Sequence, residues 1–210
     1  MLRVPWRFPV SLTLLTLLAY LPVMRAGFIW DDEQHPLNAV LAAPDSLARI
    51  WTPGQTSQYY PLTFTSFWAE RQLWSTSPAG YHMVNAALHA LNALLVWLIL
   101  SQLGLSLAWL GAAIFALHPV HVESVAWVAE RKNVLSGAFY LAAMLGYWEY
   151  EKRRSRGWYF GALGLFLLAL LSKTVTCTLP AALLLARWHQ TGRLDRRDWV
   201  RMTPFLAVGI

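Results

Sequence analysis

The feature that most constrains this chain is a series of six apolar runs, each bounded by a short polar or basic segment. The runs cover residues 9–24, 81–100, 103–117, 134–150, 158–171 and 175–188, and residues 204–210 begin another. A helix that crosses a bilayer needs about 20 predominantly apolar residues. The pattern therefore predicts one all-α membrane domain over residues 1–210, a multi-span transmembrane helical bundle with about six complete spans and the start of a seventh.

The composition excludes an ordinary soluble domain. Only 13% of the 210 residues are charged, whereas soluble domains carry about 25%. The twelve tryptophans are typical of membrane interfaces, where an aromatic ring meets both lipid and water. The net charge of +6 does not indicate nucleic acid as a partner, because the basic residues form short clusters between apolar runs. The lipid bilayer is the partner that this composition predicts.

Two basic clusters orient the predicted bundle. One covers residues 152–156 and the other residues 187–201. Basic loops stay on the cytoplasmic side, so we expect a multi-pass protein of the cell membrane with a cytoplasmic N-terminus. A cleaved signal peptide is the alternative for residues 9–24, but Arg25 occupies the position where a small residue would be needed for cleavage.

The same orientation gathers the unusual polar residues on the outer face. Residues 26–78 become a long first outer loop, in which residues 62–74 are expected to form an interfacial helix. Asp31 and Asp32 lie in this loop, and residues 118–133 and Lys173 reach the same side. Charged groups at a membrane boundary are costly and often functional, so Asp31 and Asp32 are candidates for a base or a cation ligand. A solvated loop end that caps a short helix is an equally weighted alternative.

Polar residues also occur within the apolar runs. Asn85, His89 and Asn92 follow an i, i+4, i+7 spacing and share one helical face. Hydrogen bonds between helices explain such a face better than ligand binding does. Lys173 lies between two apolar runs and needs an anion or water nearby.

The segment from His118 to Glu123, His-Pro-Val-His-Val-Glu, is the most specific local pattern. Pro119 suits the first position of a helix with His118 near its cap. His118 and His121 have no further ligand nearby, so no metal site is predicted, although a divalent cation is left open as a cofactor. Arg131 could bind a phosphate or extend its charge to the membrane surface. The single cysteine, Cys177, excludes an intrachain disulfide.

Several of these motifs are similar to those of a known family. They are Phe-Ile-Trp-Asp-Asp at 28–32, Tyr-Pro-Leu-Thr at 60–63, Tyr-His at 81–82 with the Asn85 to Asn92 face, His-Pro-Val-His-Val-Glu-Ser-Val-Ala-Trp at 118–127 with Arg131, and Ser-Lys at 172–173 with Thr-Leu-Pro at 178–180. In this order they resemble the polytopic C-type glycosyltransferases, most closely the transmembrane and tetratricopeptide-repeat O-mannosyltransferases and their bacterial relatives. The chain would correspond to the N-terminal portion of such a module, truncated and without tetratricopeptide repeats.

The resemblance implies transfer of a mannose-like hexose from a polyprenyl-phosphate donor to a hydroxyl of an acceptor protein, on the extracytoplasmic face. It implies that Asp31 or Asp32 is the catalytic base. It also implies a set of donor-binding residues: Asn85, His89, His118, His121, Glu123, Arg131 and Lys173.

Two other functions remain open at this point. A transporter or flippase for lipid-linked or anionic solutes would use the same residues for binding without chemistry, but transporter sites usually lie near the bilayer midplane between related halves. A noncatalytic membrane assembly subunit would bind no donor. The gathering of acidic and basic groups on one face favours the enzyme.

Overall fold

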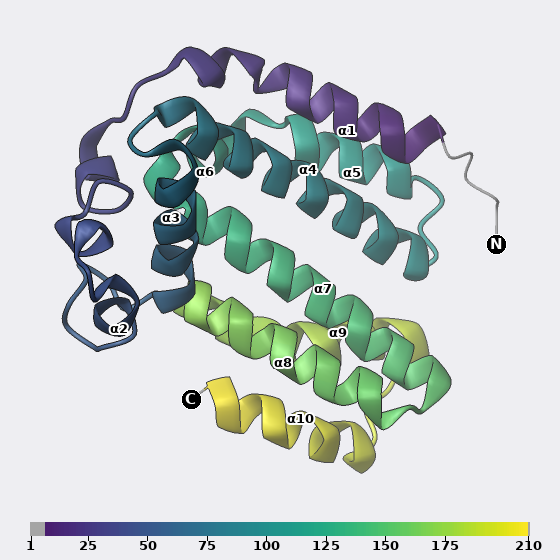
Figure 1. The fold of residues 1–210 in the computed structure, drawn as a ribbon. Helices are drawn as coiled ribbons and strands as arrows, with labels where there is room; N and C mark the ends of the chain where they lie inside the picture. Colours follow the sequence, from purple (N-terminus) through teal and green to yellow (C-terminus); the bar gives the residue numbers. More distant parts are fainter. Residues whose placement is uncertain (1–6, 210) are drawn as a thin grey trace.

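The structure is a computed structural model that describes residues 7–209, apart from the side chain of Glu33. In this range the chain folds into ten α-helices connected by loops and short 3-10 turns (Figure 1). The α-helices are α1 (Arg7–Ala19), α2 (Ser46–Ile50), α3 (Pro61–Trp74), α4 (Pro78–Gln102), α5 (Ala108–Leu117), α6 (Val122–Ala126), α7 (Arg131–Arg153), α8 (Arg156–Ser172), α9 (Leu179–Thr191) and α10 (Arg196–Gly209). The 3-10 turns are η1 (Leu21–Arg25), η2 (Trp30–Glu33), η3 (Ala39–Ala42), η4 (Pro119–His121), η5 (Val128–Glu130) and η6 (Thr174–Thr178).

The helices form two connected groups (Figure 1). In the first group, α1 and α5 pack against α4. Their contact buries Leu12 with small side chains such as Ala93 and Ala112, which let the helices approach closely. In the second group, α7 packs along α8, and α9 and α10 complete a core that includes Phe166 and Phe205. The contact between α4 and α7 joins the two groups.

The prediction of about six complete spans is wrong. In the described part of the chain, only α4, with 25 residues, is both long and apolar enough to cross a membrane. Helices α1 and α9 have 13 residues each and α5 has 10. At 1.5 Å per residue, 13 residues cover about 20 Å, whereas the hydrocarbon core of a bilayer is about 30 Å thick. Helix α7 is long enough with 23 residues, but charged residues occupy both of its ends.

Local breakers explain why the apolar runs give shorter helices than expected. The run at 103–117 loses its first residues to a turn in which Gly104 adopts a φ of +79°. The run at 175–188 begins in η6, and α9 starts only at Leu179, with Pro180 in its first turn. Proline is tolerated there because the first N–H groups of a helix have no intrahelical partner. Apolar runs in the sequence therefore mark helical segments, and caps and turns decide the helix lengths.

Other local predictions agree with the structure. The helix expected at 62–74 is α3, and the apolar runs at 81–100 and 103–117 form α4 and α5, although α5 is shorter than its run. His118 caps η4 with its Nδ1 accepting a hydrogen bond from Val120 N at 3.2 Å, and Pro119 is the first residue of that turn.

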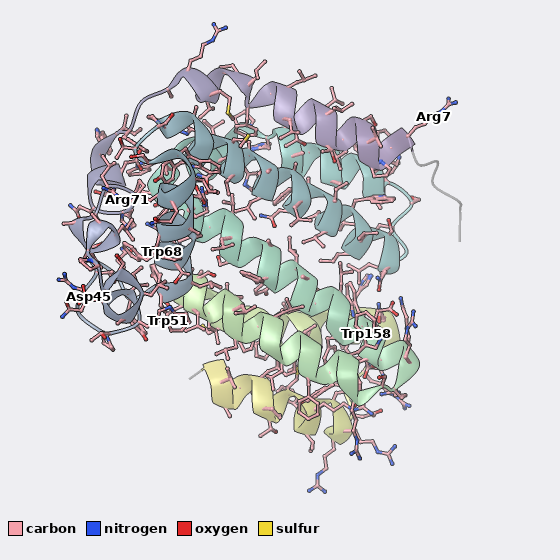
Figure 2. All side chains as sticks on the ribbon, in the orientation of Figure 1. Arg7, Asp45, Trp51, Trp68, Arg71 and Trp158 are labelled. Carbon is pink, nitrogen blue, oxygen red and sulfur yellow. The ribbon has the colours of Figure 1, made fainter. Side chains whose placement is uncertain are left out.

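The bundle has two chemically different ends. The loop end comprises residues 26–75, 118–133 and 172–178, which are tied together by hydrogen bonds such as Thr63 Oγ1 to Ser172 O at 3.0 Å. The basic end comprises residues 102–107, 149–157 and 187–201, where Lys152 Nζ donates to Gln102 Oε1 at 3.1 Å. Figure 2 shows Asp45, Trp51, Trp68 and Arg71 at the loop end and Trp158 at the basic end.

Candidate functional site

The adjacent aspartates of the loop end occupy very different environments. Asp32 is fully buried, and its two carboxylate oxygens accept backbone hydrogen bonds from Ala129 N at 2.7 Å and Ile29 N at 2.9 Å. Burial raises the pKa of Asp32, and the two backbone donors oppose that rise. The Asp31 side chain is exposed to solvent. Asp32 is therefore an anchor of the loop, and Asp31 is the carboxylate that a ligand can reach.

Tryptophan contacts complete the attachment of this loop. Trp127 donates its indole N–H to Ile29 O at 3.2 Å, and its ring meets Trp30 edge to face at a centroid distance of 5.8 Å. Trp30 itself is 83% exposed and has a φ of +46°, a left-handed conformation that is uncommon for a residue other than glycine. Strained backbone of this kind persists where surrounding contacts fix it, often at functional sites.

Arg131 lies at the centre of the loop end and is completely buried. It forms an ion pair with Glu70 of α3, in which Nη2 donates to Oε2 at 3.0 Å and Nη1 contacts Oε1. The same guanidinium donates to Tyr81 O at 3.0 Å, to Ser66 Oγ at 3.4 Å and, through Nε, to Asn85 Oδ1. All three nitrogens of Arg131 are thus engaged by groups of α3 and α4.

Asn85 extends the Arg131 network toward the loop. Its Nδ2 donates to Val125 O and Trp127 O, both at 3.1 Å. Asn92 lies about two turns further along the same face of α4 and donates to Val134 O at 2.9 Å. Both side chains therefore form the contacts between helices that the spacing on α4 favoured over ligand binding.

A second polar group surrounds Lys173. Its Nζ contacts Asn133 Oδ1, and Asn133 Nδ2 donates to Ser124 Oγ at 3.0 Å and to Glu130 Oε2 at 2.6 Å. Glu130 also pairs with Lys132 at 2.9 Å. Burial lowers the pKa of Lys173, Glu130 opposes this change, and the positive charge of Lys132 adds to it. A lysine in this setting gains from a nearby anion.

The histidines are divided between packing and the surface. His89 is buried, with Nε2 at 3.0 Å from Ala116 O, and its ring stacks on Phe115 at 5.2 Å between centroids. His121 packs against Phe115 at 4.4 Å and against His89 at 5.4 Å. His118 and Glu123 are exposed. Over residues 7–209, no group of three or more His, Cys, Asp or Glu side chains could hold a metal ion.

The structure brings together only part of the predicted site. Residues 129–133 connect Asp32, through Ala129 N, to the group around Lys173, through Asn133. No hydrogen bond or ion pair among the described residues joins the segment 118–123 to Asp31 or Asp32. The expected phosphate contact of Arg131 does not fit this geometry, because its nitrogens are buried and engaged. Asn85 and His89 have similar internal positions.

Sequence reasoning missed Glu70, Glu130 and Lys132. Of these three, Glu70 is the residue that the sequence could most readily have revealed, because a carboxylate within the apolar interfacial helix at 62–74 requires a cationic partner. The sequence contained that signal, but the partner could be named only after α3 was placed beside α7.

Similarity to curated proteins supports the resemblance carried by the motifs. The chain is 34% identical to protein O-mannosyl-transferase Tmtc1 of Drosophila melanogaster over a match of 180 residues, with coverage of 78% of this chain and 21% of that protein. It is 34% identical to protein O-mannosyl-transferase TMTC3 of Homo sapiens over 162 residues, 68% of this chain and 17% of that protein. For TMTC2 of Homo sapiens the identity is 28% over 170 residues, 70% and 20% of the two chains.

The chain is a homologue of the TMTC-type protein O-mannosyl-transferases. The aligned residues span about a fifth of the length of these relatives. No family model matches the chain. No solved structure matches it either. The relation to bacterial members of the family stays a prediction.

The buried ion pair gives a direct test of the architecture of the loop end. We expect Glu70→Gln to lower the melting temperature by roughly 6–20 °C, because an unpaired buried charge costs about 3–5 kcal/mol and each kcal/mol shifts a chain of this size by about 2–4 °C. The measurement is thermal unfolding of the detergent-purified chain. Glu149→Gln is the control, since Glu149 pairs with the exposed Lys152 and Arg153 at the basic end. Equal shifts for both variants would contradict the assignment of Arg131 as the central support.

Proposed function

We propose that this chain is a membrane glycosyltransferase that moves a mannose-like hexose from a polyprenyl-phosphate donor to a hydroxyl of an acceptor protein. The observation that supports it most is the similarity to proteins named protein O-mannosyl-transferases. The exposed Asp31, anchored through its buried neighbour Asp32, gives this chemistry a reachable base.

In this proposal Asp31 acts as the general base. Its carboxylate takes the proton of a serine or threonine hydroxyl as the hydroxyl oxygen attacks the anomeric carbon of the sugar. A new bond forms between that carbon and the acceptor oxygen, and the bond to the donor phosphate breaks with its electron pair leaving on the phosphate. Two backbone N–H groups hold Asp32 in the protein and thereby keep Asp31 at the surface. Asp31 has no ion pair among the salt bridges of the described residues.

Lys173 is the proposed partner of the departing phosphate. It is half-buried and lies beside Asn133, within the group that residues 129–133 connect to Asp32. A cation at this position stabilises the negative charge that develops on the leaving group. Arg131 supports the same segment from inside, through Glu70 and Asn85, and is not assigned a phosphate contact.

We further propose that the bundle lies in the cell membrane, with α4 crossing it and the loop end on the outer face. Large apolar side chains are exposed on the outer surfaces of several helices, among them Leu18 at 62%, Phe160 at 63% and Leu185 at 62%. Extensive exposed apolar surface is costly in water and is natural in lipid. The basic clusters at the opposite end favour the cytoplasmic side.

The two aspartates should respond differently to amide substitution. Asp31→Asn is expected to reduce sugar transfer by about 10²–10⁴-fold with an unchanged melting temperature, because only the base is lost. Asp32→Asn is expected to lower the melting temperature, because an amide NH₂ replaces one acceptor of the Ile29 and Ala129 backbone groups. Transfer of radiolabelled mannose from a polyprenyl-phosphate-linked mannose donor to protein in membrane vesicles measures the first effect, and thermal unfolding the second. Parent-like transfer by Asp31→Asn would contradict the catalytic assignment, and so would a lack of transfer by the parent chain.

Lys173 should act on the donor. Lys173→Gln is expected to weaken kcat/KM for the lipid donor by about tenfold or more, because one charge-assisted contact to the phosphate is removed. Lys173→Arg keeps the charge and should retain most of the activity. Equal loss in both variants would show that Lys173 acts only through packing.

Membrane orientation can be tested with single cysteines. In a Cys177→Ser background, Asp45→Cys should react with an impermeant maleimide added to intact cells, because residue 45 lies in the loop end. Ser155→Cys should react only after the membrane is opened, because residue 155 lies in the basic end. Both native side chains are exposed, so accessibility is set by the membrane. The reverse pattern would overturn the proposed outer-face site.

A further inference from the structure

The basic end contains a cleft that the proposed transfer reaction does not use. Its volume is about 210 Å³, and it lies where the last turns of α4, α7 and α9 meet. Trp148 and Leu183, both nearly inaccessible, contribute apolar lining. Gln102 and Gln190 contribute amide groups to the same lining. The cleft therefore combines an apolar part of its lining with hydrogen-bond donors.

Cations outnumber carboxylates around this cleft. Lys152, Arg154 and Arg187 line it, and Glu151 is the one carboxylate in the lining. Glu151 is shared, because it accepts ion pairs from Arg154 at 3.1 Å and Arg187 at 3.3 Å, and from Arg201 at 2.9 Å. With the neighbouring Glu149 and Asp198 included, three carboxylates pair with five cations around the cleft (Lys152, Arg153, Arg154, Arg187 and Arg201), so a net positive charge remains.

Arg187 is the least satisfied of these cations. Its Nε is buried and has no hydrogen-bond partner among the described residues, and the nearest carboxylate oxygen, Asp198 Oδ1, lies at 3.6 Å. Asp198 is itself shared with Arg201 at 3.7 Å. A buried N–H group without a partner is rare. Arg187 is therefore incompletely paired within the protein, while its residue also lines the cleft.

We propose that this cleft binds a phosphate-bearing anion. Phosphate offers several strong acceptor oxygens, which suit a planar guanidinium, an ammonium group and amide donors converging from three helices. The apolar lining formed by Trp148 and Leu183 fits an anion that carries a hydrocarbon part, as a phospholipid does, while a small soluble phosphomonoester presents the same headgroup chemistry. The site is at the opposite end of the bundle from Asp31 and does not depend on the proposed sugar transfer.

Native mass spectrometry of the detergent-purified chain tests the proposal. The probes are dioleoyl phosphatidic acid, glycerol 3-phosphate, and dioleoyl phosphatidylcholine as a zwitterionic control. The test variant is Lys152→Gln with Arg187→Gln, and the matched control is Arg193→Gln with Arg196→Gln, which removes the same charge from exposed residues outside the cleft lining. We expect the test variant to bind phosphatidic acid about tenfold or more weakly than the parent, and the control variant to bind like the parent.

The probes distinguish the two sources of phosphate. Cleft-dependent binding of phosphatidic acid alone supports a lipid headgroup, and cleft-dependent binding of both anions supports a site that also takes soluble phosphomonoesters. If the double variant fails to fold, Lys152→Gln alone is used, because its side chain is half-exposed and its loss leaves the Arg187 ion pairs intact. The proposal is overturned if neither anion binds, if phosphatidylcholine binds equally well, or if the control variant loses as much affinity as the test variant.

Discussion

The buried ion pair between Arg131 and Glu70 is the constraint on which the loop end depends. A fully buried guanidinium loses its hydration, and it is tolerated only where good geometry and further hydrogen bonds compensate. Here Glu70 compensates from α3, while Asn85 and Tyr81 O compensate from α4. Because Arg131 is the first residue of α7, the pair fixes three helices and the start of the segment that holds Asp32. Breaking it would therefore disturb the candidate site without touching it directly.

Adjacent carboxylates have different environments here because both lie in the 3-10 turn η2, where three residues make one turn and successive side chains point about 120° apart. Asp32 faces the protein and accepts two backbone N–H groups, whereas Asp31 faces solvent. The unusual φ of Trp30, together with its contact to Trp127, marks where the chain changes direction. A ligand approaching the loop end meets Asp31 on a support that hydrogen bonds to residues 127–129 hold in place. Preorganisation of this kind is what general-base catalysis requires.

The sequence carries the local features of this fold better than its dimensions. Periodicity and caps predicted α3, the α4 face and the His118 cap correctly, because each depends on neighbouring residues. The sequence pattern did not reveal that the run at 175–188 begins as a 3-10 turn, or that α7 extends back to the charged residue Arg131. For this reason the predicted spans were wrong. Partner choice was equally hidden. Glu70 and Arg131 are 61 residues apart, and nothing in either segment specifies the other until the helices pack.

The two ends of the bundle handle charge in opposite ways. At the loop end three buried charges have an assigned partner: Arg131 has Glu70, Lys132 has Glu130 and Asp32 has backbone N–H groups, while the buried Nη1 of Arg71 has no partner among the described residues. At the basic end, Glu151 and Asp198 are each shared among several arginines. Matched charges hold a rigid geometry, which suits a site that must position reacting atoms. Unmatched cations leave capacity for an external anion, so a phosphate group at the basic end would stabilise the junction of α4, α7 and α9 while leaving the loop end unchanged.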